Sequence, residues 1–253
     1  MIATTAPVTA PAPRPLRARV MAVVRLQVVN PWSTVGIPVA ILSLIFALNY
    51  ILFRILSSQV PDSSEWTVAT GGVSFVYVYV IVIAVTSVTQ TFPLAMGLGA
   101  TRREFSAGAW VYFGVAGVAI AAIIATAAEI EVATDGWGVP FPFFALQGVG
   151  IDSWVALFAF SLLMILLSFA TGFTIAAVYV RWRARGMYVF WVAVTLLILA
   201  AVALIVTLDA GGALVRFAVE AGALGLAATT LAITVPTAIV GYLILRRTVP
   251  PSA

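Results

Sequence analysis

The sequence predicts an all-α polytopic membrane protein with six transmembrane helices, an N-terminal interfacial amphipathic helix and a short cytoplasmic helix between spans two and three. Of the 253 residues, 63% are hydrophobic and only 9% are charged, whereas a soluble domain carries about 25% charged residues. The mean hydropathy is +1.14. Several apolar stretches also exceed the ~20 residues with which a helix crosses ~30 Å of hydrocarbon.

The N-terminal region is expected to lie outside the bilayer. Residues 1–15 are rich in Ala, Thr and Pro and hold no apolar core, which predicts a disordered cytoplasmic tail. Residues 16–29 place valines four residues apart and arginines mostly on other faces, a pattern typical of a helix in the membrane interface. Asn30-Pro31-Trp32 then breaks this helix and anchors the chain at headgroup level.

Residues 16–250 are expected to form a single transmembrane domain. Its six spans are predicted at residues 34–56, 72–95, 107–129, 153–180, 187–208 and 222–245. The fourth span is longer than a bilayer requires, so it either tilts or projects into the cytoplasm. Small residues on the third span, which suit close helix packing, are Gly108, Gly114, Gly117 and Ala121.

Arginine placement predicts the orientation of these spans. Eleven of the 13 arginines fall on one side if the N-terminus, the 96–106 loop, the 181–186 loop and the C-terminus share that side. Only Glu104 among the nine acidic residues falls there. By the positive-inside rule both termini are cytoplasmic. Basic usage restricted to Arg, together with many Ala and Val residues, suggests a bacterial source, so the expected location is the bacterial cytoplasmic membrane.

Missing residue types exclude several chemistries. The chain has no Cys or His, and all its basic residues are Arg because Lys is absent. It therefore offers no thiolate nucleophile, no His base and no zinc or haem site of ordinary type. Without Lys there is no phosphate-binding loop of the GxxxxGK[ST] kind. We expect no enzyme activity, and no cofactor, in this chain. The pI of about 9.9 reflects charge at helix ends, so no nucleic-acid partner is expected.

The stretch LGATRREFSAG (98–108) places three charges together in an otherwise apolar chain. Thr101 and Glu104 fit a capping box, in which each side chain accepts a hydrogen bond from the backbone amide of the other. Gly97 and Gly99 permit a turn out of the second span, and Pro93 loosens its end. The pattern predicts a tight turn and a short cytoplasmic helix that runs into the third span. A loop that only fixes the topology needs the arginines but neither the cap nor the glycines.

The segment TFPLAMGLGATRREFSAGAW closely resembles the region between spans two and three in permease subunits of bacterial export-type ABC transporters. Two further stretches match this pattern: RLQVVNPWSTVGIPVAILSLIFALNYI (25–51) and GYLILRRTVP (241–250). Together with the spacing of the spans, the resemblance covers most of the chain. The order and separation of the three stretches carry most of its weight.

The resemblance implies a role for the charged turn. In that family the first cytoplasmic loop is a coupling helix that docks in a groove on the ATPase subunit. The amphipathic N-terminal helix also lies at the membrane surface beside the ATPase. The corresponding docking residues here are Leu98, Gly99, Thr101, Arg102, Arg103, Glu104 and Phe105. Arg102 and Arg103 would pair with carboxylates of the partner, Glu104 would cap the helix and Phe105 would supply an apolar anchor. The family also implies two ATPase copies, with ATP and Mg²⁺ bound there, and a permease homodimer or a pair with a related permease.

Few strong polar groups lie within the spans. Asn49 in the first span and Gln90 in the second are costly in lipid and should face protein or water. Tyr79, Thr86 and Gln90 share one face of the second span. These four residues either line a translocation path at a dimer interface or make hydrogen bonds between helices.

Residues 131–152 are expected to form a compact external loop, either a structural cover or a gate. Glu129, Glu131 and Asp135 lie at the outer mouth of the third span. They either attract cationic cargo or follow the ordinary placement of acids outside the membrane, and we favour the latter.

The expected function is therefore the permease subunit of an ATP-driven exporter for an amphiphilic or hydrophobic substrate. A non-transporting scaffold or sensor coupled to a cytoplasmic partner is the alternative, because docking does not show passage of cargo. A gradient-driven transporter usually needs intramembrane acids or repeats, and neither is evident. A membrane enzyme is the least favoured class.

Overall fold

The computed structural model describes residues 15–28, 32, 36–59, 72–138, 143–144, 151 and 153–248, and helices dominate this part of the chain. They are α1 (Leu16–Val28), α2 (Ile37–Gln59), α3 (Gly72–Gly97), α4 (Arg102–Ala133), α5 (Trp154–Thr207) and α6 (Gly211–Arg246). No strand occurs among the described residues. Nearly all of the predicted tail and half of the predicted 131–152 loop lie outside them.

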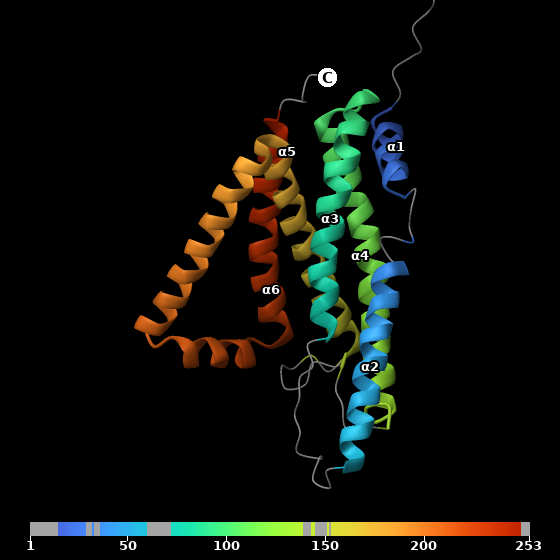
Figure 1. Cartoon of the computed structure of the whole chain (residues 1–253), viewed down its shortest axis with the longest axis vertical. Helices are drawn as coiled ribbons and strands as arrows, with labels where there is room; N and C mark the ends of the chain where they lie inside the picture. Colours follow the sequence, from blue (N-terminus) through green and yellow to red (C-terminus); the bar gives the residue numbers. More distant parts are fainter. Residues whose placement is uncertain are drawn as a thin grey trace, which may run out of the picture.

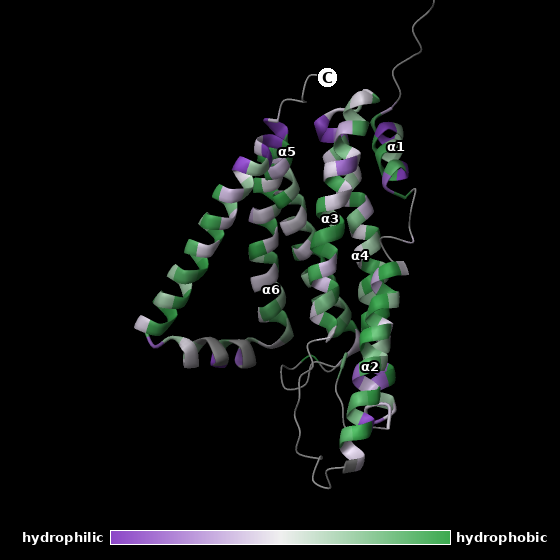
Figure 2. Ribbon diagram, viewed as in Figure 1, coloured by the Kyte–Doolittle hydropathy of each residue, from purple (hydrophilic) through white to green (hydrophobic). Residues whose placement is uncertain are grey.

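Five of these helices, α2 to α6, are long and apolar enough to cross a membrane. The all-α membrane class expected from the composition is therefore confirmed. In Figure 1, α2, α3 and α4 run side by side, and α1 lies at the upper end beside α4. Figure 2 shows strongly hydrophilic residues at this end, where α1, the α3–α4 turn and the end of α6 lie.

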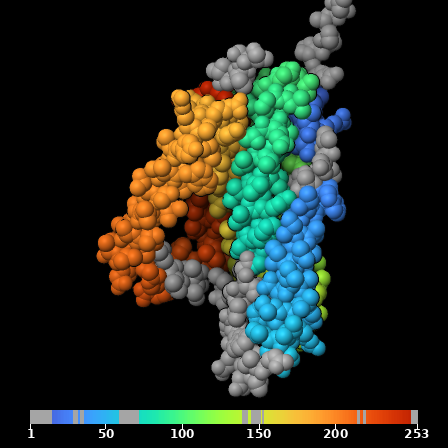
Figure 3. Space-filling view, in the orientation of Figure 1, coloured from blue at the N-terminus to red at the C-terminus, as the bar shows by residue number. Residues whose placement is uncertain are grey.

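Helix α5 is two helical arms joined at a bend. Arg183 has φ 55° and ψ −147°, values that no helix interior adopts. The second arm leaves the bundle in Figure 1, and Figure 3 shows an opening between this arm and the rest of the molecule. The most apolar window of α5 has none of its residues buried. The arms coincide with the predicted segments 153–180 and 187–208.

A second bend divides α6. Gly222 has φ 55° and ψ −159°, a backbone conformation open almost only to glycine. In Figure 1 the residues before Gly222 run from the lower end of the second α5 arm toward the bundle, and those after Gly222 run back toward the upper end.

The core lies where α3, α4 and the first arm of α5 meet. Phe113 of α4 stacks on Phe169 of α5 with ring centroids 4.4 Å apart, and both side chains are fully buried. Gly172 lets α5 approach α3 closely, because a Cβ there would lie 2.5 Å from the Ile81 carbonyl oxygen. Close packing at Gly117 is confirmed as well, since a Cβ would lie 3.3 Å from Ile165 on α5.

The turn after α3 leads directly into a helix that continues as the third span, because α4 runs without interruption from Arg102 to Ala133. The short helix expected between the second and third spans therefore corresponds to the first turns of α4. Its sequence contains no proline after the cap at Thr101, so nothing stops the helix once it has begun. At 32 residues α4 is about 48 Å long, which exceeds the ~30 Å thickness of a hydrocarbon core.

The Gly222 bend gives a matched pair of substitutions. We expect Gly222→Ala to lower the free energy of unfolding by roughly 1–3 kcal/mol, because alanine is strained at a positive φ. Gly212→Ala should instead be neutral or stabilising by up to about 1 kcal/mol, since that glycine is helical. A Cβ meets no atom within 4 Å at either site, so only backbone conformation differs. Thermal unfolding midpoints in mild detergent measure both; equal midpoints would contradict the bend.

Candidate functional site

The turn between α3 and α4 is built by a glycine cap. The Gly99 amide donates to the Met96 carbonyl at 3.0 Å, and the Ala100 amide donates to the Ala95 carbonyl at 3.0 Å. This pair of bonds is a Schellman motif, which places its C′ residue in a left-handed conformation. Gly99 holds that position with φ 82°. Of the two glycines predicted to make the turn, Gly99 is the one whose conformation requires glycine.

A capping box then starts α4, as the sequence predicts. The Thr101 hydroxyl accepts a hydrogen bond from the Glu104 amide at 3.3 Å. The Glu104 Oε2 atom accepts one from the Thr101 amide at 2.9 Å. Glu104 also lies in the first turn of α4, where a negative charge is favoured by the helix macrodipole. The chain therefore leaves the turn in a fixed direction.

Glu104 also binds the N-terminal helix. Its Oε1 atom lies 3.0 Å from Nη1 of Arg19 on α1, in a hydrogen-bonded ion pair. The Glu104 side chain is 4% exposed and that of Arg19 is 43% exposed. Removing one partner of such a pair leaves the buried charge poorly compensated, which costs more than loss of a surface ion pair. This contact unites α1 with the turn.

Two further contacts hold α1 against the bundle. Gly108 of α4 lies under Val23, so that a Cβ on Gly108 would be 2.7 Å from the Val23 side chain. The Ser87 hydroxyl of α3 donates to Oε1 of Gln27 at 2.7 Å. Both Val23 and Gln27 are buried. The amphipathic helix therefore packs on α3 and α4 along much of its length.

The turn also reaches the C-terminal end of α6. Nη1 of Arg102 donates to the Arg246 carbonyl oxygen at 2.8 Å. The last carbonyls of a helix lack partners within the helix, and an arginine side chain can satisfy them. Arg102 thus makes a contact within the chain, whereas the resemblance assigned it to a partner's carboxylate.

The expected apolar anchor is wrong. Phe105 is fully buried and packs edge-on against Phe92, with ring centroids 5.1 Å apart. It faces α3 rather than the surroundings, so it is not available to a docking partner. The exposed apolar side chain of the turn is Leu98, which is 68% exposed. Arg103 and Thr101 are exposed as well.

The four residues considered for a path do not form one cluster. Asn49 is half-buried on α2 and donates to the Ile45 carbonyl of its own helix at 2.8 Å. Thr86 and Gln90 are exposed on α3, one turn apart. Tyr79 is half-buried on the same helix, with its ring 5.7 Å from that of Phe75. Thr86 and Gln90 therefore face the surroundings of the monomer.

A second buried carboxylate organises the opposite end of α4. Oε2 of Glu131 accepts hydrogen bonds from the Phe143 and Phe144 amides, each at 3.0 Å, and from Nε1 of Trp137 at 3.3 Å. The rings of Trp137, Phe143 and Phe144 pack around Phe46 of α2, with centroids 5.2–5.6 Å away. Glu131 is thus an internal acceptor, while Glu129 and Asp135 are exposed.

The sequence alone did not predict which residues contact Arg19, Gln27 and Arg102. Arg19 was identified as a topology signal, and its pairing with Glu104 depends on how α1 packs. The Gln27–Ser87 and Arg102–Arg246 contacts join residues 60 and 144 positions apart. The sequence feature that indicated close packing at this position was Gly108, a small residue on the third span.

Substitutions of two glycines in α4 test whether α1 packs against α4 at Gly108. We expect Gly108→Ala to lower the free energy of unfolding by roughly 1–3 kcal/mol, because the methyl group would overlap Val23. Gly114→Ala, where a Cβ meets nothing within 4 Å, should be neutral or slightly stabilising. Thermal midpoints in detergent distinguish the two, and a neutral Gly108→Ala would mean that α1 does not pack there.

Comparisons with known proteins do not assign the chain to a family. No family model matches the chain, and no curated protein or solved structure matches it either. The site consists of an exposed turn, with Leu98, Thr101 and Arg103 at its surface, anchored to α1 and to the end of α6.

Proposed function

We propose that this chain is the permease subunit of an ATP-driven exporter of the ABC type in a bacterial cytoplasmic membrane. Separate ATPase subunits, which bind ATP and Mg²⁺, would dock on the end of the molecule that holds α1, the α3–α4 turn and the end of α6, called here the Arg-rich end. The observation that carries the proposal is the construction of the α3–α4 turn. It is exposed at Leu98 and Arg103 yet joined to α1 through Glu104 and to α6 through Arg102.

Six spans follow from treating the arms of α5 separately. A straight helix of 54 residues would be about 81 Å long, far more than the ~30 Å of hydrocarbon. The bend at Arg183 divides it into two segments of suitable length. With α2, α3, α4 and the later part of α6 the count is six, and both termini then lie on the Arg-rich, cytoplasmic side.

This arrangement supports transmission of force. A partner that binds Leu98 and Arg103 would move the turn, and the turn cannot move without α4, which begins at its cap. Through Glu104 and Arg102 the same movement reaches α1 and the end of α6. Nucleotide-dependent differences in the ATPase contacts would supply the energy, because a conformational change requires different affinity for the two states.

A second permease would complete the path. The second arm of α5 is apolar and almost wholly exposed, as is much of α6. Pairing with an identical or related permease would form the walls that one chain lacks, with Asn49, Tyr79, Thr86 and Gln90 as candidate lining residues. No charged residue lies near the centre of a proposed span, so an amphiphilic or hydrophobic substrate suits such a path.

Purification of the tagged chain from its native membrane tests the docking step. We expect an ATPase bearing a phosphate-binding loop to copurify with vanadate-sensitive activity. Arg103→Glu and Leu98→Asp should each reduce its yield at least about tenfold, equivalent to ~1.4 kcal/mol. Both side chains are exposed, so the permease itself should remain folded. Arg102 is unsuitable for this purpose because it bonds to α6.

Arg54→Glu is the matched control, since it reverses an exposed charge on α2 at the opposite end. It should leave the yield of ATPase unchanged. A wild-type chain that purifies without any ATPase, under conditions that preserve known transporter complexes, would contradict the proposal. Copurification without ATP-dependent transport in vesicles would favour the scaffold or sensor alternative.

A further inference from the structure

A pocket of about 460 Å³ lies on the inner side of the bend in α5. Ligand-binding pockets typically measure about 300–1,000 Å³. Its lining residues come from both arms and are Val178, Trp182, Arg185, Gly186, Val189 and Phe190. The docking turn contributes none of them, so the pocket is distinct from the site described above.

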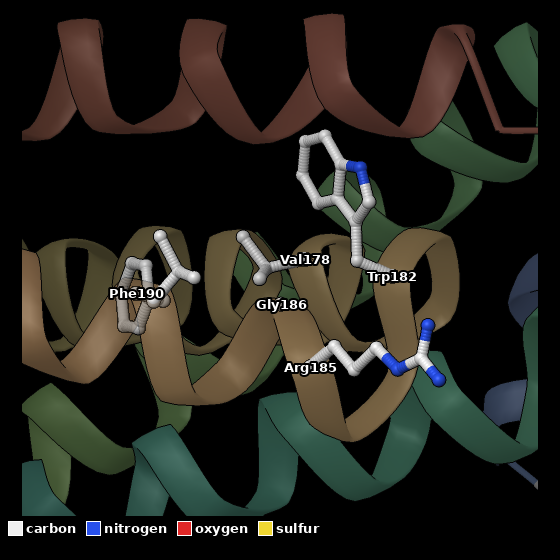
Figure 4. Close-up of a pocket in the computed structure, with 6 residues that line it drawn as sticks. Val178, Trp182, Arg185, Gly186 and Phe190 are labelled. Carbon is white, nitrogen blue, oxygen red and sulfur yellow. The ribbon is translucent and has the colours of Figure 1, made fainter.

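The lining changes from apolar to cationic along the pocket. Figure 4 shows Phe190 at one end and Trp182 in the middle, pointing toward α6. Arg185 extends its guanidinium toward the opposite end, where α1 and the C-terminal end of α6 lie. Val189 is 72% exposed and Trp182 is 46% exposed, so the pocket is open at the side. It therefore presents a cationic head region and an apolar tail region.

Positive charge around the pocket lacks compensation. Arg181 lies over the Trp182 ring at 4.4 Å, and Arg183 lies 5.8 Å from the Tyr179 ring. The sequence contains no acidic residue between Asp152 and Asp209. Nor does any carboxylate of the described chain pair with Arg181, Arg183 or Arg185. An anionic group placed beside Arg185 would meet attraction without a competing acid.

We propose that this pocket binds an anionic phospholipid from the leaflet that the Arg-rich end of the protein faces. Its phosphate would bind at Arg185, and its acyl chains would lie along Val189 and Phe190. Tryptophan favours the headgroup level of a bilayer, which suits the position of Trp182 between these regions. Basic pockets between transmembrane helices on the cytoplasmic side are suited to anionic headgroups. This inference is independent of the proposed transport activity.

The apolar lining favours lipid over an acidic protein. Val189 and Phe190 lie on the bilayer side of Arg185, within the predicted span 187–208, where a water-soluble protein does not reach. A bound lipid would also contact both arms of α5 across Arg183, whose backbone lies outside the helical region. Occupancy would therefore favour the bent form of α5.

Quenching of Trp182 by brominated lipid tests the proposal. The full chain is placed in phosphatidylcholine vesicles with an equal fraction of either brominated phosphatidylglycerol or brominated phosphatidylcholine. The signal of Trp182 is the difference between wild type and Trp182→Phe. We expect phosphatidylglycerol to be preferred by about fivefold, the effect of one arginine near an anionic group. High salt should weaken the preference.

Matched variants identify the group responsible. Arg185→Gln should remove the preference, whereas Arg185→Lys should retain it. Arg216→Gln, an exposed change on α6 before the Gly222 bend, should leave it unchanged. Val189→Phe, which fills the pocket, should reduce quenching by both lipids without requiring any loss of charge.

Three results would overturn the proposal. Equal quenching of wild-type Trp182 by both lipids would show only nonspecific surrounding lipid. Displacement by soluble glycerol phosphate would show an anion site without acyl-chain recognition. Displacement by an acidic peptide that leaves the tail region empty would show that the arginines bind protein.

Discussion

The start of α4 and the packing of α1 against it both depend on the buried carboxylate of Glu104. An ionised group out of water is costly unless it is paired and hydrogen-bonded, and Glu104 has both kinds of partner. The Thr101 amide and the Arg19 guanidinium occupy different oxygens of the same carboxylate. Starting α4 and holding α1 are therefore coupled, because each uses the group that the other stabilises.

A buried carboxylate lies at each end of α4, and different interactions stabilise the two. Glu104 lies in the first turn, where the helix macrodipole favours a negative charge. Glu131 lies in the last turns, where the macrodipole opposes it, and two backbone amides and one indole N–H offset this cost. One carboxylate thus organises the amphipathic helix and the turn, and the other holds Trp137, Phe143 and Phe144 against α2. Between them the core is apolar, with stacked phenylalanines and glycines at the helix crossings.

Local patterns in the sequence were sufficient for the features that depend on neighbouring residues. The apolar helices follow from composition, and the Thr101–Glu104 capping box follows from a four-residue motif. Contacts between distant elements could not be derived in this way. Phe105 is buried because of how α4 faces α3, and Arg102 bonds to α6 because the end of that helix lies beside the turn.

The position of α1 relative to α4 is the most direct measure of what Glu104 does. The chain contains no cysteine, so spin labels can be attached at Met21→Cys on α1 and Val132→Cys on α4, both exposed positions. Val132 lies 24 residues beyond Gly108, about 36 Å along the helix, within the range of electron–electron distance measurement. We expect a single narrow distance distribution that broadens in Glu104→Ala and stays narrow in Glu129→Ala. A distribution that is equally narrow in Glu104→Ala would contradict the central role of this carboxylate.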